Sequence, residues 1–170
     1  MRATRTRLEA YLFALVTDLE RLGAALSAPA ALQHDGRGRV AFDLRATLAS
    51  TLEDRPADLR LTEVWVPAAT SRGARGRRTE VLERVTYGYE LIDRARDRRR
   101  AFHRHDVDYF RGLAEVEVHE HCEEPLGDPG CRHFFGRPVR DGYEAIRLLL
   151  AAWSEPGRLG CDLLECIDAA

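Results

Sequence analysis

The chain has 170 residues, of which 45% are apolar and 32% charged, and its formal net charge at pH 7 is −2. This length and composition predict a single folded domain, residues 1–170, with a hydrophobic core, and they exclude an intrinsically disordered chain. The small negative charge argues against a generally basic nucleic-acid-binding protein.

The placement of charged residues and cysteines suggests a cytoplasmic protein. No apolar run approaches the roughly 20 residues that a membrane-spanning helix needs. Glu9 and Asp18 interrupt the first apolar stretch, which argues against a secretion signal. The four cysteines form no Cys-x-x-Cys pair, and in a cytoplasmic protein we expect them to be reduced thiols. We also expect no association with a membrane.

Arginine is concentrated in one part of the chain. Residues 72–104 hold eleven arginines against five acidic residues, a local charge of +6. The simplest interpretation is two solvated loop tips, and the alternative is a surface for RNA, DNA or an acidic partner.

A helix is predicted near each end of the chain. Apolar residues recur at helical spacing from Leu8 to Leu26, before Pro29 breaks the pattern. A second apolar stripe runs from Tyr143 to Trp153, and Asp141 with Glu144 has the spacing of a helix-capping box.

Between these helices the apolar residues alternate with period two, which is typical of strands. The predicted strands cover Val40–Leu48, Leu59–Val66, Val81–Ile92, Ala101–Asp106 and Ala114–Glu124. Short connections between them indicate an antiparallel meander. We therefore predict an α+β fold: an N-terminal helix, a mainly antiparallel sheet of about five strands, and one or two C-terminal helices packed on one face.

The stretch EVEVHEHCEE holds the strongest candidate for a functional site. In a strand, His119 and His121 share one face, while Val116 and Val118 share the other. The valines favour the core, so we expect both histidines to be exposed on the opposite face. The preceding strand brings either Arg104 and Asp106 or His103 and His105 next to them, and the sequence leaves the register open.

One chemistry for these residues is phosphodiester cleavage without a metal. One histidine can accept the proton of a ribose 2′-hydroxyl and another can protonate the leaving oxygen. Arg104 would stabilise charge on the phosphate and Asp106 would orient an imidazole. The candidate catalytic residues are thus His119, His121, Arg104 and Asp106, with no cofactor.

Two other interpretations stay open. Several zinc-ligand types occur close together, namely His119, His121, Cys122, Cys131 and His133. Their spacing matches no standard zinc finger, and Cys122 points away from the histidines if the strand continues. The simplest alternative is a solvated strand end whose histidines bind neighbouring glutamates.

The order of these motifs resembles the TumE family, small toxins of bacterial toxin–antitoxin pairs. The resemblance covers Leu59 to Trp153 and rests on TYGYELI, the Arg-x-Asp of Arg104–Asp106, and HEH at His119–His121. In the family's pattern an aromatic residue stands at 105, an asparagine at 107 and a lysine at 120, whereas this chain has His105, Val107 and Glu120.

Membership would imply a toxin that acts on RNA or translation and is held inactive by a cognate antitoxin protein. Arg104, Asp106, His119 and His121 would then be the motif positions. Our leading hypothesis is a toxin that cleaves RNA, and the rival is a non-enzymatic interaction domain, stabilised by a metal at the His/Cys cluster.

Overall fold

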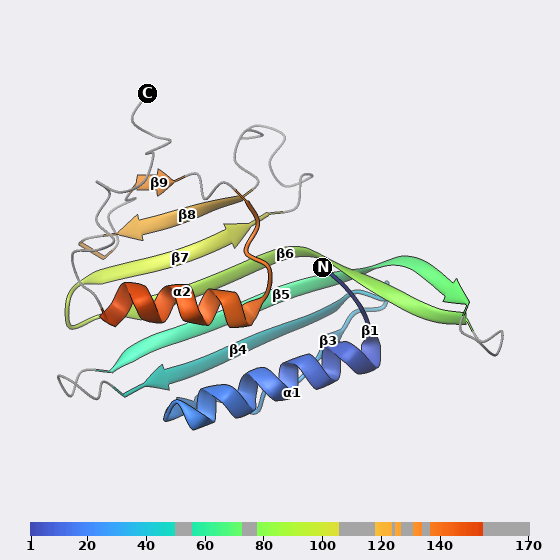
Figure 1. Cartoon of the computed structure of the whole chain (residues 1–170), viewed down its shortest axis with the longest axis horizontal. Helices are drawn as coiled ribbons and strands as arrows, with labels where there is room; N and C mark the ends of the chain where they lie inside the picture. Colours follow the sequence, from blue (N-terminus) through green and yellow to red (C-terminus); the bar gives the residue numbers. More distant parts are fainter. Residues whose placement is uncertain are drawn as a thin grey trace.

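The protein has an α+β fold in which two helices pack on one large antiparallel sheet (Figure 1). The computed structural model describes residues 1–49, 56–72, 78–105, 118–123, 125–126, 131–133 and 137–154. The side chains at 69–72, 78–79, 131–133 and 152–154 are not among those described.

The sheet contains nine strands in the described part of the chain, more than the five that the sequence predicts. They are β1 (Arg2–Thr4), β2 (Ala24–Leu26), β3 (Gln33–His34), β4 (Val40–Leu48), β5 (Ala57–Arg72), β6 (Arg78–Asp93), β7 (Arg98–Arg104), β8 (Val118–Glu123) and β9 (Cys131–His133). The four additional strands, β1, β2, β3 and β9, have two or three residues each, too few to show alternation.

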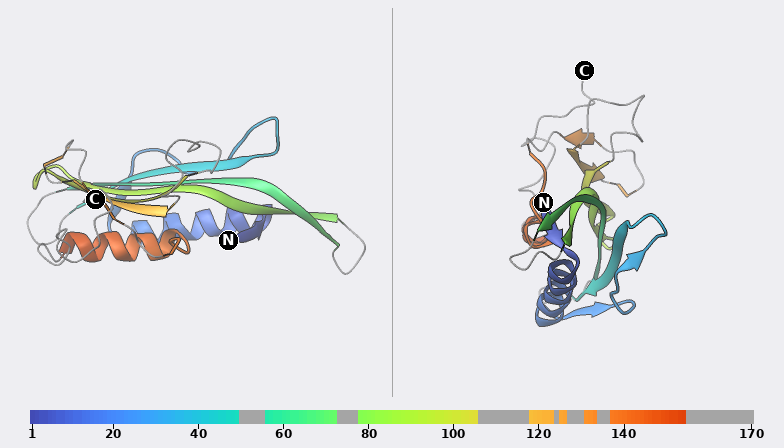
Figure 2. Two further views of the ribbon diagram at one scale, coloured as in Figure 1. Left: turned by 90° about the horizontal axis from the view of Figure 1, so that it is seen from above. Right: turned by 90° about the vertical axis from the view of Figure 1, so that its right-hand side faces the viewer.

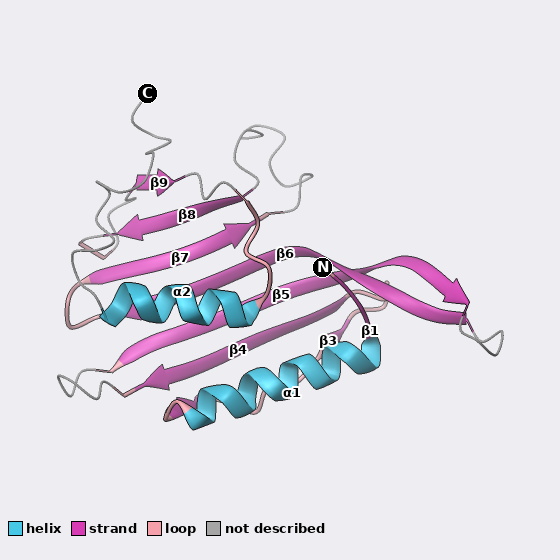
Figure 3. Cartoon of the chain, viewed as in Figure 1, coloured by secondary structure: helices cyan, strands magenta, loops and turns pink. Residues whose placement is uncertain are grey.

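The main path of the sheet is β2-β4-β5-β6-β7-β8-β9, with β1 beside β6 and β3 beside β4, and every pair is antiparallel. The helices α1 (Arg5–Arg21) and α2 (Gly142–Ser154) lie on the same face, as predicted (Figures 2 and 3). The helices cover this face because its side chains are mainly apolar. On β4, for example, Val40, Phe42 and Leu44 are buried from solvent and contribute to the core under the helices.

Helix α1 is shorter than the apolar pattern predicts. Its inward stripe, Leu8, Leu12, Leu15 and Leu19, is buried. Gly23 ends the helix with a φ of 77°, a left-handed conformation that glycine adopts without strain. The chain then continues as β2, so Leu26 lies in a strand and not in the predicted helix. No helix in the described ranges is long and apolar enough to cross a bilayer.

Strand β5 extends beyond Pro67, where the sequence predicts its end. The register with β4 stops at the pair Val40–Trp65, so from Val66 onward β5 has lost that neighbour. Proline is tolerated at such a sheet edge because its missing N–H removes no interstrand bond there. β5 therefore continues to Arg72 beside β6, with an irregularity between Pro67 and Ala69.

An extra residue in β6 changes which side chains face the core. Val64 pairs with Thr86, but Trp65 pairs with Arg84, which leaves Val85 without a counterpart in β5. Such a bulge reverses the alternation. Tyr87 and the residues after it at every second position therefore face the helices, whereas before the bulge Arg84, and not Val85, is buried on that face.

This bulge completes a buried polar network around Glu63. The carboxylate, with no exposed surface, accepts hydrogen bonds from Tyr11 Oη at 2.8 Å, Trp65 Nε1 at 2.9 Å, Arg84 at 3.2 Å and the Tyr89 hydroxyl. Burial raises the pKa of the Tyr11 and Tyr89 hydroxyls, so both remain protonated donors.

The network also fixes the beginning of α2. Arg84 donates to the carbonyls of Val139 and, at 2.9 Å, Arg140. Gly142 N donates to Tyr11 Oη at 2.7 Å. A Cβ at position 142 would lie 2.8 Å from that hydroxyl, so the close approach of α2 to α1 requires glycine.

The predicted capping residues of α2 are confirmed. Glu144 N donates to Asp141 Oδ1 at 2.9 Å, which satisfies one free amide at the helix start. The Glu144 carboxylate accepts from Arg140 N at 2.7 Å and binds Arg137 through both terminal nitrogens. Ile146 and Leu149 of the predicted stripe are buried, while the side chain of Trp153 lies outside the described residues.

Replacing Glu63 with glutamine should destabilise the fold by about 3–5 kcal/mol, because it leaves the buried Arg84 without its counter-charge. Asp43→Asn is the control, since its partners Arg45 and Arg60 are 59% and 45% exposed and such pairs contribute about 0–1 kcal/mol. Urea unfolding of both variants measures the difference, and equal losses would contradict the assigned role of Glu63.

Lowering the pH should destabilise the wild type more than a variant that lacks the Glu144 carboxylate at the start of α2. The hydrogen bonds from Arg137, assisted by Arg140, lower the pKa of this carboxyl from 4.5 to about 2. The unfolded chain therefore takes up this proton at higher pH than the folded chain, and stability is lost as the pH falls from about 5 to 2. The free energy of unfolding should fall more steeply in this window for the wild type than for Glu144→Gln, and parallel curves would contradict the assignment.

Candidate histidine centre

The register of β7 and β8 brings two His-x-His motifs together on one face of the sheet. His103 pairs directly with His119, and Ala101 pairs with His121. Directly opposed residues of an antiparallel pair share a face, and alternation adds His105 to the same side. His103, His105, His119 and His121 form what we call the histidine cluster.

The four rings contact one another closely. Ring centroids are 4.7 Å apart for His119 and His121, 5.1 Å for His105 and His119, and 5.5 Å for His103 and His119. His119 Nε2 lies 2.9 Å from His121 Nε2. In addition, His103, His105 and His119 each offer one ring nitrogen such that all three nitrogens lie within 4.8 Å of one another.

The cluster is more buried than the sequence predicts. His119 is 4% exposed and the other three histidines are half-buried, so the expectation of two exposed histidines is wrong. The rings from β7 pack against those of β8, which removes part of their surface from water. Burial, and secondarily the neighbouring His103, lowers the pKa of His105 and so favours its neutral form.

A carboxylate lies beside the cluster. Glu90 of β6 has its Oε1 3.8 Å from His103 Nε2, and it accepts a hydrogen bond from Arg99 Nε at 3.1 Å. The interaction with His103 is the largest cause of the low pKa of Glu90, which is about 2. Burial opposes this shift, and Arg99 adds to it. Glu90 is therefore an anion at neutral pH.

Three imidazoles with converging nitrogens suit a transition metal. Zinc binds histidine nitrogen at about 2.0–2.1 Å with tetrahedral geometry, so two ligand nitrogens on one ion lie about 3.3 Å apart. The nitrogens of His103, His105 and His119 are within 4.8 Å of each other, and rotation of the side chains can bring them closer. The residues present therefore fit a three-histidine centre.

Arg104, another predicted site residue, does not join this cluster. Arg104 pairs with Val118, on the face opposite to the histidines, so the composite of Arg104 with His119 and His121 is not formed. Asp106 lies outside the described residues. His103 and His105 were the alternative neighbours that the sequence offered, and their pattern, His-x-His on the preceding strand, was the available signal.

Among the described side chains, the His/Cys set considered for zinc is divided between the two faces of the sheet. Cys122 pairs with Arg100 and alternates with His121, so it belongs to the opposite face, and it forms no disulfide. On β9, position 131 pairs with Cys122 and position 133 with Glu120, which also alternate with the histidine positions. The side chains of Cys131 and His133 lie outside those described.

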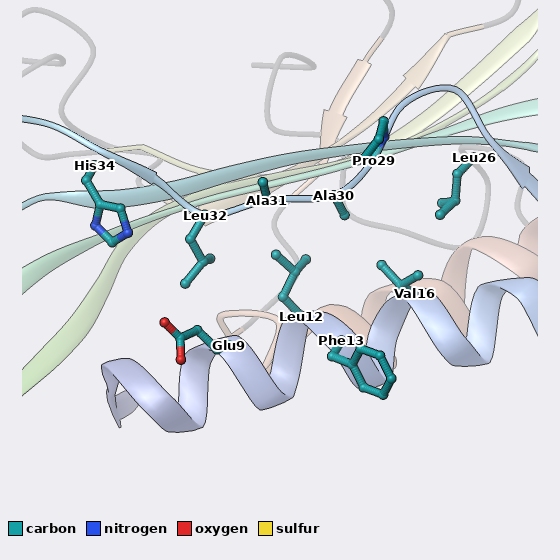
Figure 4. Close-up of a pocket in the computed structure, with 10 residues that line it drawn as sticks. All are labelled: Glu9, Leu12, Phe13, Val16, Leu26, Pro29, Ala30, Ala31, Leu32 and His34. Atoms are coloured by element: carbon teal, nitrogen blue, oxygen red, sulfur yellow. The ribbon is translucent and has the colours of Figure 1, made fainter.

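A groove of about 480 Å³ lies on another part of the molecule, between α1 and residues 26–34 (Figure 4). Its walls are mainly apolar, including Leu12, Val16 and Leu32, and Glu9 and His34 lie at the same end. No group of reactive side chains converges on the groove, so the histidine cluster is the stronger candidate site.

In comparisons with known proteins, no family model, no curated protein and no solved structure matches the chain.

Proposed function

We propose that the protein binds a divalent transition metal ion through His103, His105 and His119. The observation that carries this proposal is the convergence of one ring nitrogen from each of these three residues within 4.8 Å. Imidazole nitrogen is a preferred ligand of zinc and neighbouring metals, and the lowered pKa of His105 favours the neutral form that ligates.

A metal held by three protein ligands keeps a fourth position for water or substrate. Zinc in such a site lowers the pKa of bound water to about 7 and so supplies a nucleophile near neutral pH. His121, whose Nε2 lies 2.9 Å from His119 Nε2, lies beside the proposed ligands. The reaction class that we propose is therefore metal-assisted hydrolysis.

The wild-type chain should bind one Zn²⁺ or Co²⁺ per molecule, and alanine at 103, 105 or 119 should weaken binding by more than 100-fold, because each substitution removes a ligand. Isothermal titration with Zn²⁺ measures this. Arg104→Ala and His34→Ala are the controls, since Arg104 lies on the other face and His34 is exposed on β3. Failure of the wild type to bind stoichiometrically would refute the proposal.

The contact between His119 and His121 favours a second candidate, RNA cleavage by histidine acid–base catalysis without a metal. This is the activity that we inferred for a toxin of the TumE type, with a cognate antitoxin as its partner. Two imidazoles in contact can divide the roles of base and acid. The position of Arg104 removes it from this chemistry, because its strand position faces the other side of the sheet.

Incubation of the purified chain with RNA, with and without EDTA, separates the two candidates. Acid–base cleavage would persist in EDTA, and His119→Ala or His121→Ala would lower its rate by about 10²–10⁴-fold. Metal-assisted cleavage would cease in EDTA and return with added Zn²⁺. In both cases Arg104→Ala should leave the rate within a few-fold of the wild type. Absence of cleavage under all conditions would exclude RNA as the substrate.

A further inference from the structure

Glu90 occupies the boundary between the histidine cluster and a chain of ion pairs. Its carboxylate approaches His103 Nε2 at 3.8 Å through Oε1. Its Oε2 accepts a hydrogen bond from Arg99 Nε at 3.1 Å and forms an ion pair with Arg99 Nη2, also at 3.1 Å. The exposed fractions of the side chains of His103, Glu90 and Arg99 are only 14%, 19% and 18%, so water screens these contacts weakly.

Arg99 restricts the conformations that the Glu90 side chain can adopt. Its guanidinium binds Glu90 on β6 and, through NH1, Glu123 on β8, so the cation spans three adjacent strands from its own position on β7. The fork geometry of a guanidinium holds a carboxylate in a defined orientation. Glu90 therefore faces His103 with little freedom to swing into solvent.

The strand opposite His103 leaves room for this contact. Gly88 pairs directly with His103, and a Cβ built at position 88 would lie 3.6 Å from His103 Cδ2 and 3.0 Å from Thr62 Oγ1. A Cβ at this distance would be in ordinary van der Waals contact with His103, so the ring lies against β6 at Gly88. The contact thus follows from the positions of both residues in the sheet.

We infer that Glu90, held by Arg99, is a positioning residue that fixes the ring of His103 for metal binding. Ligating histidines usually donate their second ring N–H to a carboxylate, which sets the tautomer and orientation of the ring and raises its basicity. His103 would direct Nε2–H to Glu90 and keep Nδ1 for the metal. This inference rests on the proposed three-histidine centre.

The test is Co²⁺ binding to the full chain, measured as affinity and as the visible absorption spectrum of the bound ion. Glu90→Gln should weaken Co²⁺ binding by about 10–100-fold, the usual effect of losing such a partner. Glu123→Gln is the matched control, because it removes the other carboxylate that Arg99 binds. Its affinity should stay within about threefold of the wild type.

The spectrum and a second variant separate the remaining outcomes. An unchanged Co²⁺ spectrum in Glu90→Gln supports a positioning role, whereas a shifted spectrum would make Glu90 a ligand and overturn it. Glu90→Asp keeps a carboxylate for Arg99 but moves it away from His103, so it should also bind Co²⁺ more weakly than the wild type. It replaces the glutamine variant if that variant does not fold. Equal affinities of wild type, Glu90→Gln and Glu90→Asp overturn the inference, while a wild type that binds no Co²⁺ refutes the metal centre itself.

Discussion

The buried carboxylate of Glu63 is the constraint on which the arrangement of the elements depends. A charge without exposed surface is tolerated in a protein only if it is paired and hydrogen-bonded, and here four donors meet that need. These donors come from α1, β5 and β6, and Arg84 continues the network to the segment before α2. Moving any one of these elements would leave a buried polar group without its partner, so the network fixes both helices on the sheet.

The bulge at Val85 connects this network to the candidate site. It turns Arg84 toward Glu63 and sets the alternation of the rest of β6, so that Tyr87 and Tyr89 face the helices. Gly88 and Glu90 then face the other side, where Gly88 pairs with His103 and Glu90 approaches it. One strand thus carries the buried ion pair on one face and the support of the histidine cluster on the other.

The sequence predicts those features that local patterns determine. Alternation reveals β4 and most of β5 to β8, and the spacing of Asp141 and Glu144 reveals the start of α2. It does not reveal the bulge, because Arg84 looks like an ordinary solvent-facing strand residue until its partner is known, namely Glu63 on the inward face of β5 beside Leu61 and Trp65. It also leaves the register of β7 and β8 open: the segments around His103 and His119 are polar on alternate positions in either register, so only tertiary packing decides which residues meet.

The register has an electrostatic consequence for the cluster. Two protonated imidazoles about 5 Å apart repel each other by roughly 3 kcal/mol at an effective dielectric constant near 20. Neighbouring rings of the cluster lie 4.7–5.5 Å apart, so they are within this distance of one another. A single divalent ion instead accepts the lone pairs of several imidazole nitrogens at once, without a proton on each of those nitrogens. Its ligands would come from β8 and the end of β7, so the ion would also link these two strands. The convergence of ring nitrogens from His103, His105 and His119 is therefore the physical reason to propose a metal centre rather than a set of independent acid–base histidines.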